Sequence, residues 1–324
     1  MKTDTEISPI GIIAGQGTLP VQVAQGIKAA GHRVICLGLS GQSREDLLIP
    51  QCDVFSRVGL IRLNQWVRIL RRHGATRAVM VGRVAKERIY DRYYMFRYVP
   101  DWRTARLWFL RLRNDKRSDR LLRAVADELQ TGGVTLIDAL PYIPDALAQP
   151  GVMTAIQPTA AIAADADFAW PLLRRMNELL IGQSLACKDR EIIAVEAMEG
   201  TDRMIERAGL LCKRGGWVLC KASNPNQDLR FDVPTVGPST IENLKKAGAA
   251  GLVLEAGKTI MLDKPQLLKL ADKLGIVVVG RENRHMQTCV YRAPLRRRFP
   301  QLPTNVANPP TATKPQRTRK ATTV

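Results

Sequence analysis

Hydrophobic and polar positions along the first half of the chain alternate in the order strand, turn, helix, strand. The apolar run Ile10–Ala14 leads into two glycines, a helix-like stretch covers Leu19–Ala30, and Arg33–Leu37 follows as a second strand. Such units are typical of parallel sheets. The pattern continues with a helix at Gln65–His73, a strand at Ala78–Val81, a helix at Ser118–Leu129 and a strand at Val134–Ile137.

The same alternation resumes after a stretch punctuated by prolines between Pro141 and Pro158, where we place a domain boundary. Asp263, with Pro265 close behind it, predicts the start of the last helix. The other predicted helices are Phe168–Leu180, Thr201–Cys212 and Ile241–Ala247, and the predicted strands are Ile192–Val195, Trp217–Cys220, Leu252–Leu254 and Ile276–Val279.

We therefore predict an α/β fold made of two α/β domains with mainly parallel sheets and an active site in the cleft between them. The N-terminal domain covers residues 1–145 and contains an insert at 88–117, and the C-terminal, catalytic domain covers residues 150–285. Residues 286–324 form a basic tail rich in Pro and Thr, whose composition predicts disorder because it cannot bury a core.

Composition narrows the class of protein. The chain has 324 residues, 45% of them apolar, and no run approaches the ~18 apolar residues of a membrane span. Its first residues do not form a secretory signal, so a cytoplasmic protein is expected. Six scattered cysteines without a CxxC pair and three isolated histidines argue against disulfides or a zinc site. Any metal is therefore expected to be a hard cation bound by carboxylates.

Positive charge is concentrated in two segments. The net charge is +19, and residues 57–123 carry nineteen Lys/Arg against five Asp/Glu, while residues 292–324 carry eight and none. The insert at 88–117 also holds eight of the seventeen aromatic residues. Three interpretations stay open for it: a core helix with solvated arginines, a segment that contacts anionic lipid, or a platform that stacks the bases of single-stranded RNA.

A glycine turn follows the first predicted strand. Gly15, Gln16 and Gly17 lie where backbone N–H groups at a helix N-terminus can bind phosphate. The spacing differs from GxGxxG, and the second strand does not end in the acidic residue that holds an NAD ribose, which disfavours a dinucleotide fold. A tight turn that requires glycine for steric reasons is the alternative interpretation.

A second cluster of candidate residues follows the strand Ile192–Val195. Glu196, Glu199 and Asp202 are three carboxylates within seven residues, a pattern that suits Mg²⁺ and a phosphate-bearing ligand. Thr201 and Asp202 also suit the N-cap and first turn of a helix, which would be a purely structural role.

The strand Trp217–Cys220 leads into a third candidate segment. Lys221 and Arg230 could neutralise phosphate oxygens, and Asp232 could bind a metal or orient water. Asp228 lies in the same segment. Loops that follow strand carboxyl ends are where α/β folds place their sites, although a loop rich in Asn, Asp, Pro and Gly is usually only a loop.

Several strings, in order from about residue 10 to 280, resemble the LpxI-type UDP-2,3-diacylglucosamine pyrophosphatases of lipid A synthesis. The most specific are VEAMEGTDRMI and RFDVPTVG. The others are IGIIAGQGTLP, VGRV, DRLLRAVADEL, IGQSLACKDREII, GLVLEAGKTIMLD and LGIVVVG. The resemblance implies two α/β domains, a Mg²⁺-dependent enzyme (with Mn²⁺ as the alternative ion), and UMP and 2,3-diacylglucosamine 1-phosphate as products.

The resemblance also assigns residues. Asp232, within RFDVPTVG, matches the essential aspartate of the family and is predicted to be catalytic. As a hypothesis, Asp232 binds the metal with help from Glu199 or Asp202. The residues predicted to bind substrate are Gly15, Gln16, Gly17, Gln183, Gly200, Thr201, Lys221 and Arg230.

Three features depart from the family pattern. Asn224-Pro225 stands where the family usually has Lys-Pro, and the aromatic, basic insert and the basic tail are additional. The expected partners are a lipid-linked sugar nucleotide and, peripherally, the inner-membrane surface of a Gram-negative-type cell, without nucleic acid; a homodimer is left open. Two rival functions remain, a nucleic-acid-binding protein and a sugar-nucleotide or lipid-phosphate binder without catalysis.

Overall fold

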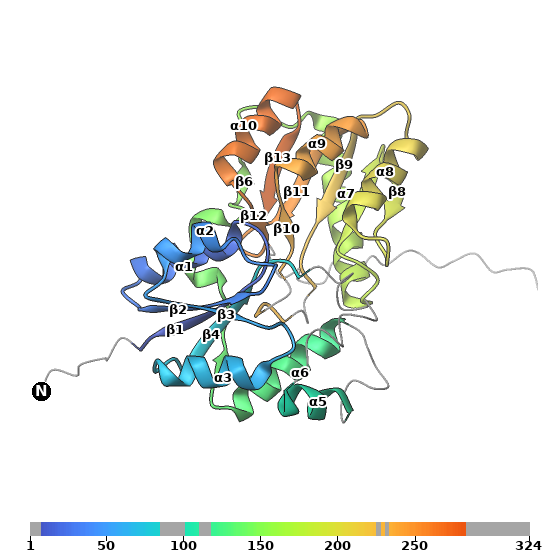
Figure 1. The fold of residues 1–324 in the computed structure, drawn as a ribbon. Coiled ribbons are helices and arrows are strands. Elements are labelled where there is room, and N and C mark those ends of the chain that lie inside the picture. Colours follow the sequence, from blue (N-terminus) through green and yellow to red (C-terminus); the bar gives the residue numbers. More distant parts are fainter. Residues whose placement is uncertain (1–7, 85–100, 110–117, 225–227, 231–232, 283–324) are drawn as a thin grey trace, which may run out of the picture. The chain divides into compact units, whose positions relative to one another are not determined.

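The computed structural model describes residues 8–84, 101–109, 118–224, 228–230 and 233–282 (Figure 1). All of these belong to one compact unit, Met1–Asn283. The predicted tail, most of the insert at 88–117, and Asp232 lie outside the described residues.

The first sheet contains five strands that are all parallel to their neighbours. Its order is β3-β2-β1-β4-β5. The strands are β1 (Ile10–Ala14), β2 (Val34–Leu39), β3 (Val54–Val58), β4 (Arg77–Val81) and β5 (Thr135–Leu136).

Helices cover both faces of this sheet, so the side chains of β1 alternate between two cores. Ile12 packs with α1 (Leu19–Ala29) and α2 (Glu45–Leu48), and Ile13 packs on the other face. That face is covered by α3 (Leu63–Arg72), α5 (Trp102–Leu107) and α6 (Ser118–Thr131) (Figure 1). The 3-10 turns Ile49–Gln51, Leu140–Tyr142 and Pro144–Ala146 complete this half.

The second sheet has six strands in the order β6-β13-β11-β9-β7-β8. Its centre, β13-β11-β9, is parallel, whereas β6, β7 and β8 pair antiparallel to their neighbours. The strands are β6 (Gly151–Val152), β7 (Ser184–Lys188), β8 (Glu191–Val195), β9 (Trp217–Lys221), β11 (Ala249–Glu255) and β13 (Val277–Arg281), and a separate parallel pair joins β10 (Thr235–Val236) to β12 (Ile260–Met261).

The long helix α7 (Ala160–Glu178) covers one face of this sheet and three helices cover the other (Figure 1). The three are α8 (Thr201–Leu211), α9 (Pro238–Lys246) and α10 (Lys264–Leu274). The fully buried Trp217 lies in the core beneath these three helices, while its strand neighbour Val218 packs against α7.

The predicted α/β class with parallel-rich sheets is confirmed, and several details differ. The strands β3 and β7 were not predicted, and α7 begins eight residues before the predicted start at Phe168. Thr159 caps α7, its hydroxyl accepting a hydrogen bond from the Ile162 backbone N–H. Asp263 occupies the predicted N-cap position of α10, but its side chain makes no capping hydrogen bond.

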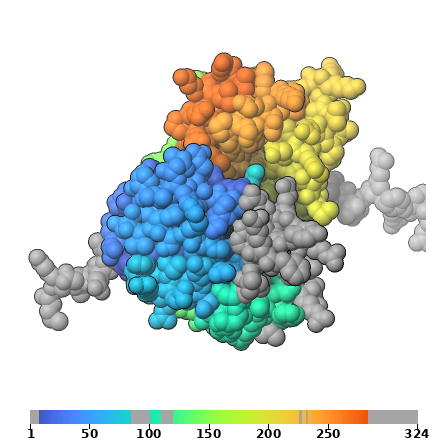
Figure 2. All heavy atoms as spheres, viewed as in Figure 1, coloured from blue at the N-terminus to red at the C-terminus, as the bar shows by residue number. Residues whose placement is uncertain are grey.

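The described part of the insert is an ordered helix at the surface. Asp101 caps α5 and accepts a hydrogen bond from the Asn64 backbone N–H of α3 at 2.6 Å. Leu107 is buried, whereas Trp102 and Phe109 expose 60% and 69% of their surface. Figure 2 shows this green segment at the surface of the face in view. None of the described helices is long and apolar enough to cross a membrane.

Candidate functional site

The carboxyl end of β9 places a buried lysine against the first residue of α8. Lys221 exposes only 7% of its surface, and its Nζ donates a hydrogen bond to Thr201 Oγ1 at 2.7 Å. The Thr201 hydroxyl in turn lies 3.1 Å from both carboxylate oxygens of Glu196. Three residues, one from β9, one from α8 and one directly after β8, therefore form one hydrogen-bonded chain.

Gly200 is the N-cap residue of α8 and has φ 84°, a left-handed value that glycine adopts readily. The interpretation of Thr201 as the N-cap is therefore wrong, because Thr201 is the first helical residue. A glycine cap supplies no side chain to the N–H groups of the first turn, and a Cβ at Gly200 would meet no atom within 4 Å. Uncapped N–H groups beside an ammonium group favour an anion.

The two carboxylates predicted to help bind metal have other partners. Glu199 forms an ion pair with Arg207, and hydrogen bonds from its own backbone N–H and from Arg207 lower the pKa of Glu199. Asp202 accepts a hydrogen bond from Asn243 Nδ2 at 3.2 Å. Within the described ranges, no three His, Cys, Asp or Glu side chains gather as a metal site. The predicted catalytic residue, Asp232, lies outside those ranges.

Arg230 forms a bidentate ion pair with Asp228. Its Nε and Nη2 donate to the two carboxylate oxygens at 2.8 and 2.5 Å, and these bonds lower the pKa of Asp228. Gln183 contributes its backbone, because its carbonyl accepts a hydrogen bond from the Ala222 N–H at 3.0 Å.

The glycine turn after β1 has a steric explanation at Gly15. A Cβ there would lie 2.6 Å from the carbonyl oxygen of Arg83, because the chain crosses the end of β4 at close range. Gln16 and Arg83 exchange backbone hydrogen bonds at 2.8 and 3.1 Å across this crossing. Gly17 has φ 98°, and a Cβ there would meet no atom within 4 Å, so its requirement is conformational and the space beside it is open.

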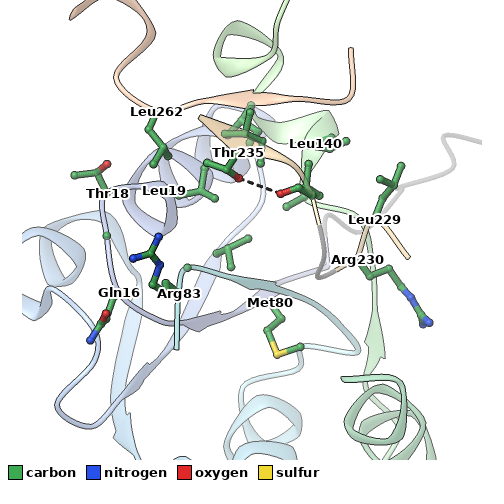
Figure 3. A pocket seen from close by; sticks show the side chains of 17 residues that line it. Gln16, Thr18, Leu19, Met80, Arg83, Leu140, Leu229, Arg230, Thr235 and Leu262 are labelled. Carbon is green, nitrogen blue, oxygen red and sulfur yellow. Dashed lines mark hydrogen bonds between the residues drawn. The ribbon is translucent and has the colours of Figure 1, made fainter. Parts of the chain in front are cut away.

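That open space belongs to a pocket of about 660 Å³ (Figure 3). Gln16, Gly17 and Arg230 all line it, so the structure brings together residues that are more than 200 positions apart in the sequence. Arg83 lines it too, and Figure 3 shows its guanidinium group and that of Arg230 on opposite sides of Met80. Apolar side chains, including Leu19, Leu140, Leu229 and Leu262, supply much of the wall.

The predicted residues thus fall into two groups. Gln16, Gly17 and Arg230 line the pocket, whereas Thr201 and Lys221 meet at the start of α8 and do not line it. The sequence indicated Glu196 only as part of the carboxylate cluster that suits Mg²⁺, whereas the structure places it against the Thr201 hydroxyl. No binding role was predicted for Arg83, although it belongs to the string VGRV.

The fold and the candidate site define an α/β protein with two large sheets, a lysine at the carboxyl end of the central strand β9, and a separate, partly apolar pocket lined by Arg83 and Arg230. Residues 9–146 match the LpxI N-terminal domain and residues 149–279 match the LpxI C-terminal domain. The chain therefore belongs to the LpxI family. A relative, UDP-2,3-diacylglucosamine pyrophosphatase LpxI from Caulobacter vibrioides (strain ATCC 19089 / CIP 103742 / CB 15), is 32% identical over 280 residues, which cover 84% of this chain and 96% of the relative.

Proposed function

We propose that this protein hydrolyses the pyrophosphate bond of UDP-2,3-diacylglucosamine in lipid A synthesis. Water attacks one phosphorus, the bond from that phosphorus to the bridging oxygen breaks, and the products are UMP and 2,3-diacylglucosamine 1-phosphate. The observation that carries the proposal is the family match along residues 9–279, supported by a relative named for this activity.

The diphosphate is the part of the substrate that the cationic groups would bind. Lys221 and the uncapped N–H groups of α8 offset the negative charge of phosphate oxygens, and that charge grows as the bridging bond breaks. Thr201 fixes the Lys221 ammonium group, so little reorganisation is needed when the substrate binds. Arg230 and Arg83 lie at the pocket, where an amphiphilic substrate would find both charge and apolar walls.

We also propose a divalent cation, Mg²⁺ or Mn²⁺, held by Asp232. Such an ion supplies further neutralisation of the diphosphate. Glu199 and Asp202 remain candidate ligands, but each would have to exchange its present partner, Arg207 or Asn243, for the cation. Carboxylate oxygens are the donors that these hard cations prefer.

The decisive experiment measures UMP release by the purified full-length chain from UDP-2,3-diacylglucosamine with Mg²⁺. We expect turnover that EDTA lowers at least ~10-fold and that added Mg²⁺ restores, because the cation is needed to neutralise the diphosphate. Undiminished turnover in EDTA would contradict the metal requirement while leaving the hydrolase assignment intact.

Absence of UMP release would overturn the hydrolase proposal. Binding of the substrate without turnover would then support a sugar-nucleotide binder. Affinity for RNA or DNA that falls steeply with salt would instead support the nucleic-acid function suggested by the basic segments.

We further propose that the protein works at the membrane surface, with the insert at 88–117 as its contact. The exposed Trp102 and Phe109 are suited to the interface of a bilayer, and the surrounding arginines to anionic lipid. Deleting the insert would also remove Asp101 and the buried Leu107. A double substitution, Trp102→Ser with Phe109→Ser, therefore tests the contact with less damage to the fold.

We expect this double variant to co-sediment with phosphatidylglycerol vesicles at most half as well as the unchanged protein, because it loses the interfacial aromatic groups. Leu210→Ser is the matched control, since Leu210 is also exposed, at 74%, but lies on α8. Equal pelleting of the double variant and the control would refute the assignment of this contact.

A further inference from the structure

A fully buried carboxylate lies beside the point where the chain leaves β9. Glu255 is the last residue of β11 and has no exposed surface. Leu254 is paired with Lys221 in the parallel β9–β11 ladder, so Glu255 lies one residue beyond that pair. Its Oε2 accepts hydrogen bonds from the backbone N–H of Ser223 at 2.8 Å and from the Ser223 hydroxyl at 2.5 Å.

Two residues of α7 also bind the backbone at Ser223. The carbonyl oxygen of Ser223 accepts from Asn177 Nδ2 at 3.0 Å and from Arg174 Nη1 at 3.2 Å. Asn177 Nδ2 also lies 3.2 Å from the Ala222 carbonyl oxygen. Both backbone polar groups of Ser223 are thus bonded to side chains at a point beyond the end of β9. We call Arg174, Asn177, Ser223 and Glu255 the Ser223 anchor.

The charge of Glu255 is balanced at its other oxygen. Oε1 lies 3.3 Å from Arg174 Nη1 and 3.4 Å from Lys258 Nζ. Burying a carboxylate costs free energy even when it is paired, and a well-packed apolar cluster often serves stability as well or better. A gain in stability therefore does not explain why this carboxylate is buried. A role in fixing the direction in which the backbone leaves β9 at Ser223 does explain it.

In the sequence, Ser223 lies between the two residues that are most important for the proposed reaction. Lys221, two residues before Ser223, reaches Thr201 on the face of α8, and Asp232 follows nine residues after Ser223. We infer that Glu255 is a positioning residue, which acts through Ser223 to hold the carboxyl end of β9, so that Lys221 stays against Thr201 in the reactive geometry. This inference rests on the proposed hydrolase function.

The test compares Glu255→Gln with a control at the other end of the same sheet. Glutamine keeps the length but directs an NH₂ group either at the Ser223 backbone N–H or at the cations of Arg174 and Lys258, and none of these groups can accept a hydrogen bond. Asp165 is a suitable control because it is 2% exposed and accepts a hydrogen bond from the Arg190 backbone N–H at 2.7 Å, in the turn between β7 and β8. Asp165→Asn therefore also disturbs a buried bond between a carboxylate and the backbone.

We expect Glu255→Gln to lower kcat for UMP release roughly 30-fold with little change in KM, within the ~100-fold that a displacement of about 1 Å costs. Ser223→Ala, which keeps the N–H bond, should lower kcat roughly fivefold. Asp165→Asn should leave kcat within about twofold, because an undisturbed reactive geometry leaves the barrier unchanged. The melting temperatures of both Asp165→Asn and Glu255→Gln should nevertheless fall, because each variant disturbs a buried hydrogen bond.

Hydrogen exchange separates this inference from the proposed function, because it needs no substrate. The amide of Ser223 should exchange faster in Glu255→Gln than in Asp165→Asn. The inference is overturned if exchange at Ser223 is unchanged, or if Asp165→Asn lowers kcat as much as Glu255→Gln at a matched loss of stability. If the unchanged protein releases no UMP, the hydrolase function fails, and the exchange data alone decide whether the anchor exists.

Discussion

Asp232→Ala is expected to lower kcat for UDP-2,3-diacylglucosamine by ~1,000-fold or more while the protein still folds. The residue stands within RFDVPTVG, the string that most specifically resembles the family. Loss of the proposed cation-binding carboxylate would remove several kcal/mol of charge stabilisation, and about 4 kcal/mol corresponds to ~1,000-fold in rate. Single-turnover UMP release, followed beside circular dichroism of the variant, measures both properties.

A surface aspartate of the same domain serves as the control. Asp167 on α7 has a side chain that is 69% exposed and pairs with Arg281, and exposed pairs contribute little to stability. Asp167→Ala should therefore keep nearly full activity. Near-normal turnover by Asp232→Ala would end its assignment as the catalytic residue, and an equal loss in the two variants would point to a general effect of lost negative charge.

Most of the fold could be predicted because apolar runs and turn residues carry the signal for buried parallel strands. The missed strands explain the limit of that signal. In β3 only Val58 is buried, and the sequence VFSRV is neither a continuous apolar run nor a regular alternation of apolar and polar residues. Neither of the two patterns that predict a strand is therefore present. The strand β7 is joined to β8 through Asp189 and Arg190, which both have positive φ, although the second central residue of such a turn is usually glycine.

Of the candidate site, only part of the spatial arrangement could be predicted from the sequence. Strand ends and helix starts meet at one edge of an α/β sheet, which explains why Thr201 and Lys221 were both selected from sequence and lie 2.7 Å apart. The partners of the carboxylates could not be predicted in this way. Glu199 pairs with Arg207 eight residues later, and Asp202 with Asn243 on another helix, and neither choice follows from spacing alone.

Glu255 shows why tertiary context is needed to find a positioning residue. Its string, GLVLEAGKTIMLD, resembles the family pattern, but nothing in the sequence singles out its glutamate. Only the pairing of β11 with β9 brings this carboxylate to Ser223, 32 positions away in the sequence. From sequence alone, a glutamate at the end of an apolar strand is expected to be exposed to solvent. Its burial can be predicted only when the neighbouring strand is known to place a hydrogen-bond donor beside it.

Lys221→Met should lower the activity of the protein without lowering its stability. We expect kcat/KM for UMP release to fall roughly 100- to 1,000-fold, as the loss of one preorganised donor does in other active sites. Burying an ammonium group costs free energy that methionine does not incur, so the melting temperature should stay constant or rise. Steady-state kinetics and thermal melting of the same preparation test both halves of this prediction.

Lys188→Met provides the matched control for Lys221. Lys188 is the last residue of β7, and because β7 runs antiparallel to β9 it lies at the opposite edge of the sheet from Lys221. Its Nζ lies 3.5 Å from Asp189 Oδ1. This control should retain kcat/KM within about twofold, because Lys188 is not expected to contribute to the activation free energy of hydrolysis. If both lysine variants lose activity equally, overall positive charge rather than the Lys221–Thr201 contact promotes the reaction.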